Sequence, residues 1–455
     1  MKRSLPKSVS APLGWVPSAA AALLLAVSAG CVSDAGRQST KTDAPSPLAV
    51  QSEADGARRV RVSAEGEKAA EPSVAVAPEG EVYVSWVAHG AGREADVWLA
   101  RFDGGGRQDG APVRVNPSAG GATAWRGDPP DVAVAPDGAV YVAWTARAGG
   151  GGHGTTLFLS ASRDGGRSFA PPVRVNDDAK DCVHGMHSLN AGRDGRVYLA
   201  WLDERNAAPP QDESKHGAPK SGERAGAPKA SGGMHGEQNR KVFFAASTDG
   251  GRTFSPNRRV ASEACPCCKT ALAASADGRV YIGWRQVLPG DMRHIAVAST
   301  ENGGESFGAP VVVSDDRWEL SGCPVSGPAL AAGGGGSLRV LWYTAGEAGR
   351  PGLYSSESGD GGRSFAPRRA VREGNLRGTP SLLGDGRGGL VAVFEGTDVA
   401  GANGLWRAGL GEGTATSPTV PFEAGDSASA AAQAGRVYVA YVAQGGVWLT
   451  GPLRS

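Results

Sequence analysis

The stretch Ser162-Arg-Asp164-Gly-Gly166-Arg-Ser168-Phe169 decides the fold, because close copies of it recur along the chain. Two further full copies cover residues 247–254 and 358–365, a copy with Asn302 in place of Asp covers residues 300–307, and a degenerate copy lies at residues 103–105. The Asp side chain of such a stretch accepts hydrogen bonds from nearby backbone N–H groups, and Gly adopts positive φ without steric cost. Each copy therefore predicts a tight turn between two strands.

A second pattern precedes these turns: a small apolar strand, an Asp-Gly or Glu-Gly turn, and a strand that ends in an aromatic residue. Clear copies cover residues 74–86 and 132–144, and later copies end at Trp201, Trp284, Trp342, Phe394 and Tyr441. The alternation of apolar and small residues between turn dipeptides indicates antiparallel hairpins. A third strand, such as residues 156–160, and a fourth, such as residues 172–175, complete each repeat.

Four strands per repeat, at a spacing of roughly 50 to 60 residues, are typical of the blades of a β-propeller. The repeats predict an all-β fold of seven four-stranded antiparallel blades, or of six if the repeat around Phe394 is not a blade of its own. The last repeat supplies only three strands, whereas residues 58–63 form an extra strand at the other end. We therefore expect this N-terminal strand to complete the last blade and close the ring, which removes both free sheet edges.

The recurring turn resembles the Asp box, S-x-D-x-G-x-[ST]-[FW], of the sialidase-like superfamily with its BNR repeats, over about residues 58–450. The resemblance implies that Asp164, Asp249, Asn302 and Asp360 are structural. It also implies that a ligand binds on the opposite face, where the loops between second and third strands meet the lead-in segments of the first strands. Loops on a rigid scaffold commonly carry function.

The N-terminal 31 residues resemble a bacterial lipoprotein signal, with a basic start, an apolar run over residues 19–27 and small residues before Cys31. Lipidation of Cys31 would anchor the protein on the periplasmic side or at the cell surface, whereas cleavage after Ala29 would secrete it. Residues 32–57 predict a flexible tether, and residues 58–455 a single domain with a disordered insertion at 206–239. The net charge of +1 does not favour nucleic acid as a partner. We expect membrane contact through the lipid only.

All cysteines other than Cys31 lie in the lead-in segments of three consecutive blades, accompanied by two histidines: Cys182, His184, His187, Cys265, Cys267, Cys268 and Cys323. Disulfides are one interpretation, because an exported chain meets an oxidising compartment, although five cysteines leave one unpaired. A site for copper or zinc is the other, because thiolates and imidazoles are the ligands that these ions prefer. The sequence leaves both open and requires no cofactor.

Sialidase chemistry, as the resemblance implies it, needs three arginines that clamp a carboxylate, a Tyr nucleophile and acidic partners. The candidates on the expected face are Arg126, Arg205, Arg285, Arg377, Asp203, Glu395 and Tyr343. None of them lies in a motif that matches the family, and the family's Arg-Ile-Pro motif is absent. We therefore expect a protein that binds a glycan, a peptide or protein partner, or a metal ion, without sialidase catalysis. An exo-α-sialidase-type glycoside hydrolase is the alternative.

Overall fold

The computed structural model of the 455-residue chain describes residues 57–90, 94–123, 127–148, 153–206, 240–346, 350–384, 388–397, 403–411 and 420–454. The chain divides into two units, Met1–Ala44 and Pro45–Ser455, and all described residues belong to the second. The predicted signal with Cys31, the tether up to residue 56, and residues 207–239 of the predicted insertion lie outside the described residues. No helix in the described part of the chain is long and apolar enough to cross a membrane.

The regular elements of the described residues are all β-strands, β1 to β28, so the prediction of an all-β chain is confirmed. They form five four-stranded antiparallel sheets and one eight-stranded sheet. The eight-stranded sheet consists of two four-stranded halves. The outer strand of the first half meets the second strand of the other half at the single residue pair Ala264 and Gln286. We therefore describe seven four-stranded modules, numbered in chain order.

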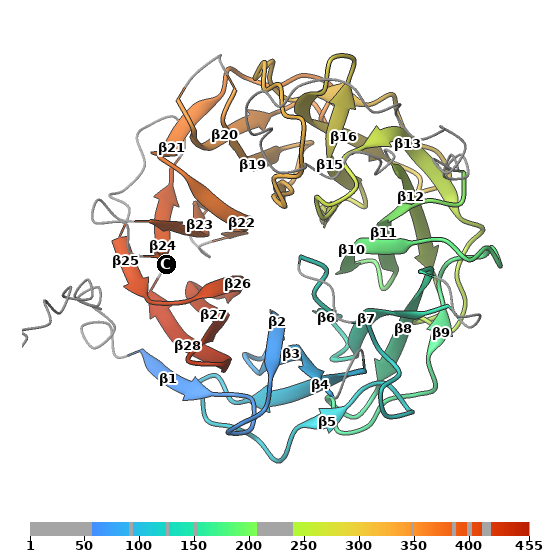
Figure 1. Cartoon of the computed structure of the whole chain (residues 1–455), viewed down its shortest axis with the longest axis vertical. Helices are drawn as coiled ribbons and strands as arrows, with labels where there is room; N and C mark the ends of the chain where they lie inside the picture. Colours follow the sequence, from blue (N-terminus) through green and yellow to red (C-terminus); the bar gives the residue numbers. More distant parts are fainter. Residues whose placement is uncertain are drawn as a thin grey trace, which may run out of the picture. The chain divides into compact units, whose positions relative to one another are not determined.

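Modules 1 to 4 follow the expected hairpin order, with the strand of lowest number innermost in Figure 1 where it is labelled. They are formed by β2 Ala69–Val76, β3 Val82–His89, β4 Ala95–Phe102 and β5 Val113–Arg114; by β6 Asp131–Val134, β7 Val140–Arg147, β8 Thr155–Ser162 and β9 Val173–Arg174; by β10 His184–Ala191, β11 Val197–Asp203, β12 Arg240–Ser247 and β13 Arg258–Ala264; and by β14 Ala271–Ala274, β15 Val280–Leu288, β16 Met292–Thr300 and β17 Val311–Val312.

Modules 5 to 7 repeat this order, and module 6 shows that Phe394 lies in a four-stranded sheet of its own. They are formed by β18 Ala329–Ala332, β19 Leu338–Thr344, β20 Gly352–Ser358 and β21 Arg369–Glu373; by β22 Leu376–Gly384, β23 Leu390–Thr397, β24 Asn403–Leu410 and β25 Val420–Glu423; and by β26 Asp426–Gln433, β27 Arg436–Ala443 and β28 Gly446–Arg454 with β1 Arg58–Arg61.

Module 7 takes its fourth strand from the beginning of the domain. β1 pairs with β28 in antiparallel register, from Arg58 opposite Gly451 to Arg61 opposite Trp448. The guanidinium of Arg59 stacks 4.3 Å from the centre of the Trp448 ring, and the backbone N–H of Val62 donates to Val447 O at 2.8 Å. β1 thereby covers the outer edge of β28 and gives module 7 its fourth strand.

The first strands of consecutive modules contact one another, and β26 of module 7 contacts β2 of module 1. Inner-strand side chains bridge several of these contacts by accepting a backbone N–H from the next module. Ser73 accepts from Val132, Asp131 from Leu189, Ser381 from Ala430, and Ser429 from Val74, at 3.2–3.4 Å. These buried or half-buried hydrogen bonds fix the register between neighbouring modules.

The core lies between adjacent modules and is centred on the aromatic residues that end the second strands. Trp86, Trp201, Trp284 and Trp342 are each at most 1 % exposed. The pleat of each second strand directs alternate side chains to its two faces, so one strand contributes to the interfaces with both neighbours. The predicted aromatic strand ends are therefore core residues.

The Asp-box turns between third and fourth strands are held by their own hydrogen bonds. In the copy at residues 247–254, Asp249 accepts from Ser247 Oγ (2.8 Å), Arg252 N (3.0 Å), Thr253 N (3.0 Å) and Thr253 Oγ1 (2.6 Å). The second glycine, Gly251, has φ +82°, and a Cβ there would lie 2.7 Å from Leu159 of the preceding module. Each such turn thus also sets how closely two modules approach.

Asp249→Asn is expected to keep the turn but to reduce the loss of stability in acid. Hydrogen bonds from the hydroxyl and N–H of Thr253 hold the pKa of Asp249 well below its ordinary 3.8. The unfolded chain therefore takes up the proton first, so this stabilisation is complete above about pH 5 and is lost as the pH falls through the folded-state pKa. Asn302 already holds the equivalent turn through Ser306 N (3.1 Å).

Urea unfolding at neutral pH and near pH 3 measures this effect. The difference in unfolding free energy between the two pH values should be smaller in Asp249→Asn than in the parent chain. An equal difference in both proteins would show that Asp249 does not contribute to the acid sensitivity.

Candidate functional site

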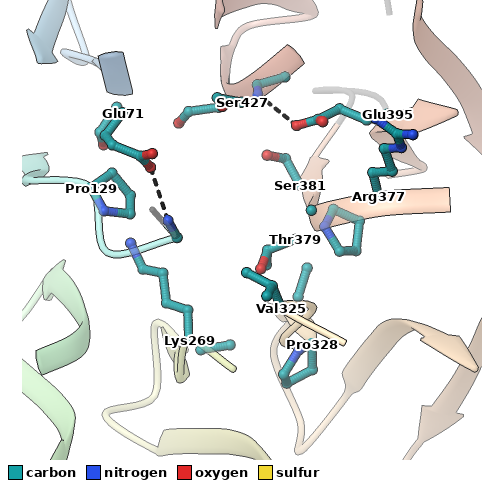
Figure 2. A pocket seen from close by; sticks show the side chains of 18 of the residues that line it. Glu71, Pro129, Lys269, Val325, Pro328, Arg377, Thr379, Ser381, Glu395 and Ser427 are labelled. Carbon is teal, nitrogen blue, oxygen red and sulfur yellow. Dashed lines mark hydrogen bonds between the residues drawn. The ribbon is translucent and has the colours of Figure 1, made fainter. Parts of the chain in front are cut away.

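A pocket with a volume of about 670 Å³ lies where the first strands of six modules begin. Its lining comes from β2, β6, β14, β18, β22 and β26 or their lead-in segments, together with Glu395 at the end of β23. The lead-in segments, where the sequence predicts ligand binding, thus contribute to the lining, whereas Glu395 lies within β23 and not in the loop after it. Figure 2 shows the labelled lining residues around the cavity.

Strained backbone surrounds this pocket. Glu71, Val325 and Ser427 have φ of 51°, 46° and 51°, and Gly127 and Gly378 are also in the left-handed region. The strand pairings of β2, β22 and β26 shift register beside these residues, which marks β-bulges. Bulges re-aim side chains, and residues in sparsely populated backbone conformations cluster at ligand sites. The bulges bring the side chains of the inner strands to the cavity wall.

Carboxylates and hydroxyls dominate the polar lining. Glu71 accepts from Gly127 N at 3.1 Å, and Glu395 accepts from Ala428 N at 2.9 Å. Figure 2 places Glu71 and Lys269 on one side of the cavity and Glu395 on the other, with the hydroxyls of Thr379 and Ser381 turned towards the space between them. Lys269 is paired with Asp131. The pocket thus offers hydrogen-bond acceptors and hydrogen-bond donors close together.

Of the four candidate arginines, only Arg377 lines the pocket. Arg126 lies outside the described residues. Arg285 is fully buried and donates to the carbonyl oxygens of Ser326 (3.0 and 2.8 Å) and Tyr343 (2.9 Å). Among the described residues, the structure therefore assembles no cluster of arginines at the pocket.

Arg205 and Asp203 belong to a separate charged network. Arg205 donates to both carboxylate oxygens of Asp203 (3.0 and 2.9 Å) and to Asn257 Oδ1 (2.8 Å), and it pairs with Asp177 at 2.5 Å. Asp203 is fully buried and also accepts from Trp201 Nε1 at 2.8 Å. These residues stabilise one another and do not line the pocket.

Tyr343 and Glu395, the remaining catalytic candidates, lie apart. Tyr343 packs edge-on against Trp318 at 5.6 Å and contacts Asn375 through its hydroxyl at 3.4 Å. Burial raises the pKa of the Tyr343 hydroxyl. Glu395 lines the pocket, whereas Tyr343 does not. Tyr343 and Glu395 therefore do not line the same pocket.

The cysteines and histidines divide into three groups. Cys182 Sγ lies 3.7 Å from His184 Nε2, which is 2.9 Å from Asp178 Oδ2. Burial, followed by the charges of Asp203 and Asp178, raises the pKa of Cys182 to about 12. This group can supply one sulfur, one nitrogen and one oxygen to a metal ion.

His187 lies apart from every cysteine group. Its Nδ1 is 3.0 Å from Asp128 Oδ1, and its Nε2 is 3.2 Å from Ala143 O. Burial raises the pKa of Asp128, but the charge of His187 and a hydrogen bond from it lower the pKa overall. His187 therefore serves the packing between modules 2 and 3.

The third group contains Cys265, Cys267, Cys268 and Cys323. Cys267 and Cys323 form a disulfide, and Cys265 and Cys268 are buried free cysteines. Cys265 Sγ lies 3.8 Å from Cys267 Sγ and 3.6 Å from Cys268 Sγ. Burial raises the pKa of Cys268, but the hydrogen bond with Cys265 and the charge of Arg285 lower the pKa overall, below its ordinary value. Four sulfur atoms thus lie close together. The group contains a disulfide, and three of its sulfur atoms are also close enough to hold a metal ion.

The pocket contains residues that sequence reasoning missed, chiefly Glu71, Thr379 and Ser427. One signal could have found two of them: a Pro–Ser pair in the first strands, at residues 72–73 and 380–381, comes directly after Glu71 and Thr379. The positive φ of Glu71 and Ser427 has no such signal, because it arises from bulges that depend on the neighbouring strands.

No protein-family model matches the chain. No curated protein matches it either. Among solved structures, an ulvan lyase described as a new family of polysaccharide lyase is similar, with a TM-score of 0.53 and 12% identity over 86% of this chain and 95% of that chain. A Hadza microbial sialidase has a TM-score of 0.47 and 12% identity over 81% of this chain and 73% of its own. The ulvan lyase comparison shows a shared fold.

Proposed function

We propose that the chain is an exported seven-bladed β-propeller that binds a neutral glycan in the pocket formed by the first strands. The observation that carries the proposal is the pocket itself, which six modules line with carboxylates and hydroxyls and beside which three inner strands form bulges. We further propose that the modules are the blades and that β1 closes their ring. The contacts between successive first strands, including β26 with β2, support this architecture.

The polar lining suits a ligand rich in hydroxyl groups. A hydroxyl both donates and accepts a hydrogen bond, so a sugar can donate to Glu71 and Glu395 and accept from Lys269 or Thr379. Five prolines also line the cavity and offer apolar surface to the C–H faces of a sugar ring: Pro72, Pro129, Pro324, Pro328 and Pro380. The ulvan lyase is described with a bound saccharide of glucuronate and sulfated rhamnose, which supports a glycan ligand in general but is itself acidic.

The charges of the pocket favour a neutral sugar over an acidic one. Among the described residues, the lining contains the carboxylates of Glu71, Asp131 and Glu395 but only two cationic side chains, Lys269 and Arg377. Lys269 is already paired with Asp131. The described lining thus carries three carboxylates and two cationic side chains, a balance that disfavours an acidic sugar and supports binding without sialidase catalysis.

The location of the protein is part of the proposal. The basic start, apolar run and small residues before Cys31 support export and a lipid anchor, with secretion after cleavage at Ala29 as the alternative. Globomycin, which blocks lipoprotein signal cleavage, should cause the precursor to accumulate if Cys31 is lipidated, and Cys31→Ala should release the chain from membranes.

Glu395→Gln is expected to weaken glycan binding about tenfold, because a hydrogen bond to a charged group contributes roughly 1.5–3 kcal/mol. Glutamine keeps the acceptor for Ala428 N, so the fold should be retained. The measurement is an array of neutral hexose and N-acetylhexosamine oligosaccharides, with sialyllactose as the acidic member, followed by calorimetry of the ligands found.

Glu79→Gln is the matched control for this experiment. Glu79 is an exposed glutamate beside a different cavity, which it shares with Gly165 and Arg167 of an Asp box. Its substitution should leave glycan affinity unchanged. Equal effects of the two substitutions would contradict the pocket assignment, and hydrolysis of a fluorogenic sialoside by the parent chain would favour the sialidase alternative.

A further inference from the structure

Beyond glycan binding, the group of four sulfur atoms has the geometry of a metal centre. We propose that Cys265, Cys267, Cys268 and Cys323 form a closed tetrahedral site for Zn²⁺ when the Cys267–Cys323 disulfide is reduced. Three of these residues, Cys265, Cys267 and Cys268, have sulfur atoms that all lie within 4.8 Å of one another. The fourth, Cys323, is already joined to Cys267.

Two sulfur–sulfur distances in the group match the edge of a zinc tetrathiolate. Zinc binds thiolate sulfur at about 2.3 Å, so the edge of the tetrahedron is about 3.8 Å. The distances from Cys265 Sγ to the sulfur atoms of Cys267 and Cys268 are 3.8 and 3.6 Å. The backbone is also held there, because Cys265 N donates to Arg285 O at 2.8 Å.

A buried arginine beside this group favours negative charge. Arg285 is fully buried with an unpartnered Nη1, and its backbone carbonyl accepts from Cys265 N at 2.8 Å. Arg293 is 6 % exposed and is already paired with Asp291 at 3.6 Å. A buried cation without a counter-charge is costly. Four neutral or disulfide-bonded cysteines supply no charge, whereas a zinc tetrathiolate carries two negative charges next to Arg285.

Zinc binding requires two steps, reduction of the disulfide and release of the thiol protons. A dithiol reductant gives two electrons and two protons to the Cys267–Cys323 disulfide and becomes a cyclic disulfide itself. Zn²⁺ then displaces one proton from each of the four thiols, so that zinc uptake releases protons. The disulfide is thus the metal-free form of the same group, and the two interpretations of the sequence describe its two states.

The Asp178–Cys182–His184 group is the weaker metal candidate. The guanidinium of Arg205 lies 3.2 Å from Asp178 and 2.8 Å from Asp203, so a cation already occupies this cluster of carboxylates. Cys182 therefore provides a matched control, because it is a free cysteine outside the group of four.

The test uses the full chain, reduced with dithiothreitol, exposed to zinc under nitrogen and freed of excess metal. We expect one zinc per chain by mass spectrometry of the metal, and X-ray absorption should give four sulfur neighbours at about 2.3 Å. The oxidised chain should retain none. Absence of stoichiometric zinc in the reduced chain, or a shell with nitrogen or oxygen neighbours, would overturn the proposal; so would uptake of copper(I) but not zinc.

Variants locate the site. Serine at Cys265, Cys267, Cys268 or Cys323 should abolish stoichiometric zinc, and Cys182→Ser should keep one zinc per chain. If Cys265→Ser and Cys268→Ser still bind zinc, the proposal fails. If a variant does not fold, the X-ray absorption spectrum of the zinc-loaded parent chain still tests the proposal.

Discussion

Gly304→Ala is expected to lower the free energy of unfolding by about 3 kcal/mol or more, from a clash and from backbone strain together. Gly304 belongs to the Asp-box copy with Asn302 and has φ +95°. A Cβ there would lie 2.0 Å from Cε1 of Phe244, which is fully buried in β12 of the preceding module. Chemical unfolding of the two proteins measures the difference.

Gly278→Ala separates the two causes. Gly278 has φ +84°, similar to that of Gly304, but no atom lies within 4 Å of the position that a Cβ would take. Only the backbone strain remains, which costs about 1 kcal/mol. If both variants lost the same stability, the approach between modules at the Asp box would have no energetic role.

Val62→Pro is expected to cost about 3 kcal/mol or more and to promote aggregation. Val62 is 4 % exposed, and its N–H donates to Val447 O at 2.8 Å, immediately after β1. Proline removes this hydrogen bond and would displace β1, which leaves β28 as an unpaired edge strand. Thermal unfolding and light scattering measure the two effects.

Glu65→Pro is the control, only three residues away. Glu65 is exposed and follows Ala64, whose carbonyl accepts from Glu67 N at 3.3 Å. Proline is favoured at this second position of a β-turn. Stability close to that of the parent chain is expected, and a large loss would mean that the effect at Val62 is not specific to the strand pairing.

Local signals in the sequence account for the parts of the fold that could be predicted. The Asp-box turns form hydrogen bonds within eight residues, and the aromatic strand ends follow from the alternation of side chains along a strand. Both depend on near neighbours in the chain. The pairing of β1 with module 7 could be expected because one repeat lacked a strand and an extra strand remained.

The site was harder to predict, because its residues depend on contacts between modules. Arg285 and Arg205 lie in segments expected on the binding face. Arg285 is buried and donates to backbone carbonyl oxygens, however, and Arg205 pairs with carboxylates. Glu71 contributes to the pocket through a bulge with positive φ, which no single repeat encodes. The sequence places the five cysteines in the lead-in segments of three neighbouring modules, but the separation of Cys182 and His187 from Cys265 required the three-dimensional arrangement.

The pairing of β1 with the last module has a kinetic consequence. Val447 N donates to Ser63 Oγ across 384 residues of chain, so the first strand to emerge during synthesis finds its partner last. Such a long-range contact closes a large loop and slows folding. Until it forms, both β1 and β28 are exposed edges, and intermediates of this kind aggregate readily. A chaperone that holds the N-terminal segment should therefore raise the yield of folded protein more than one that binds a central module.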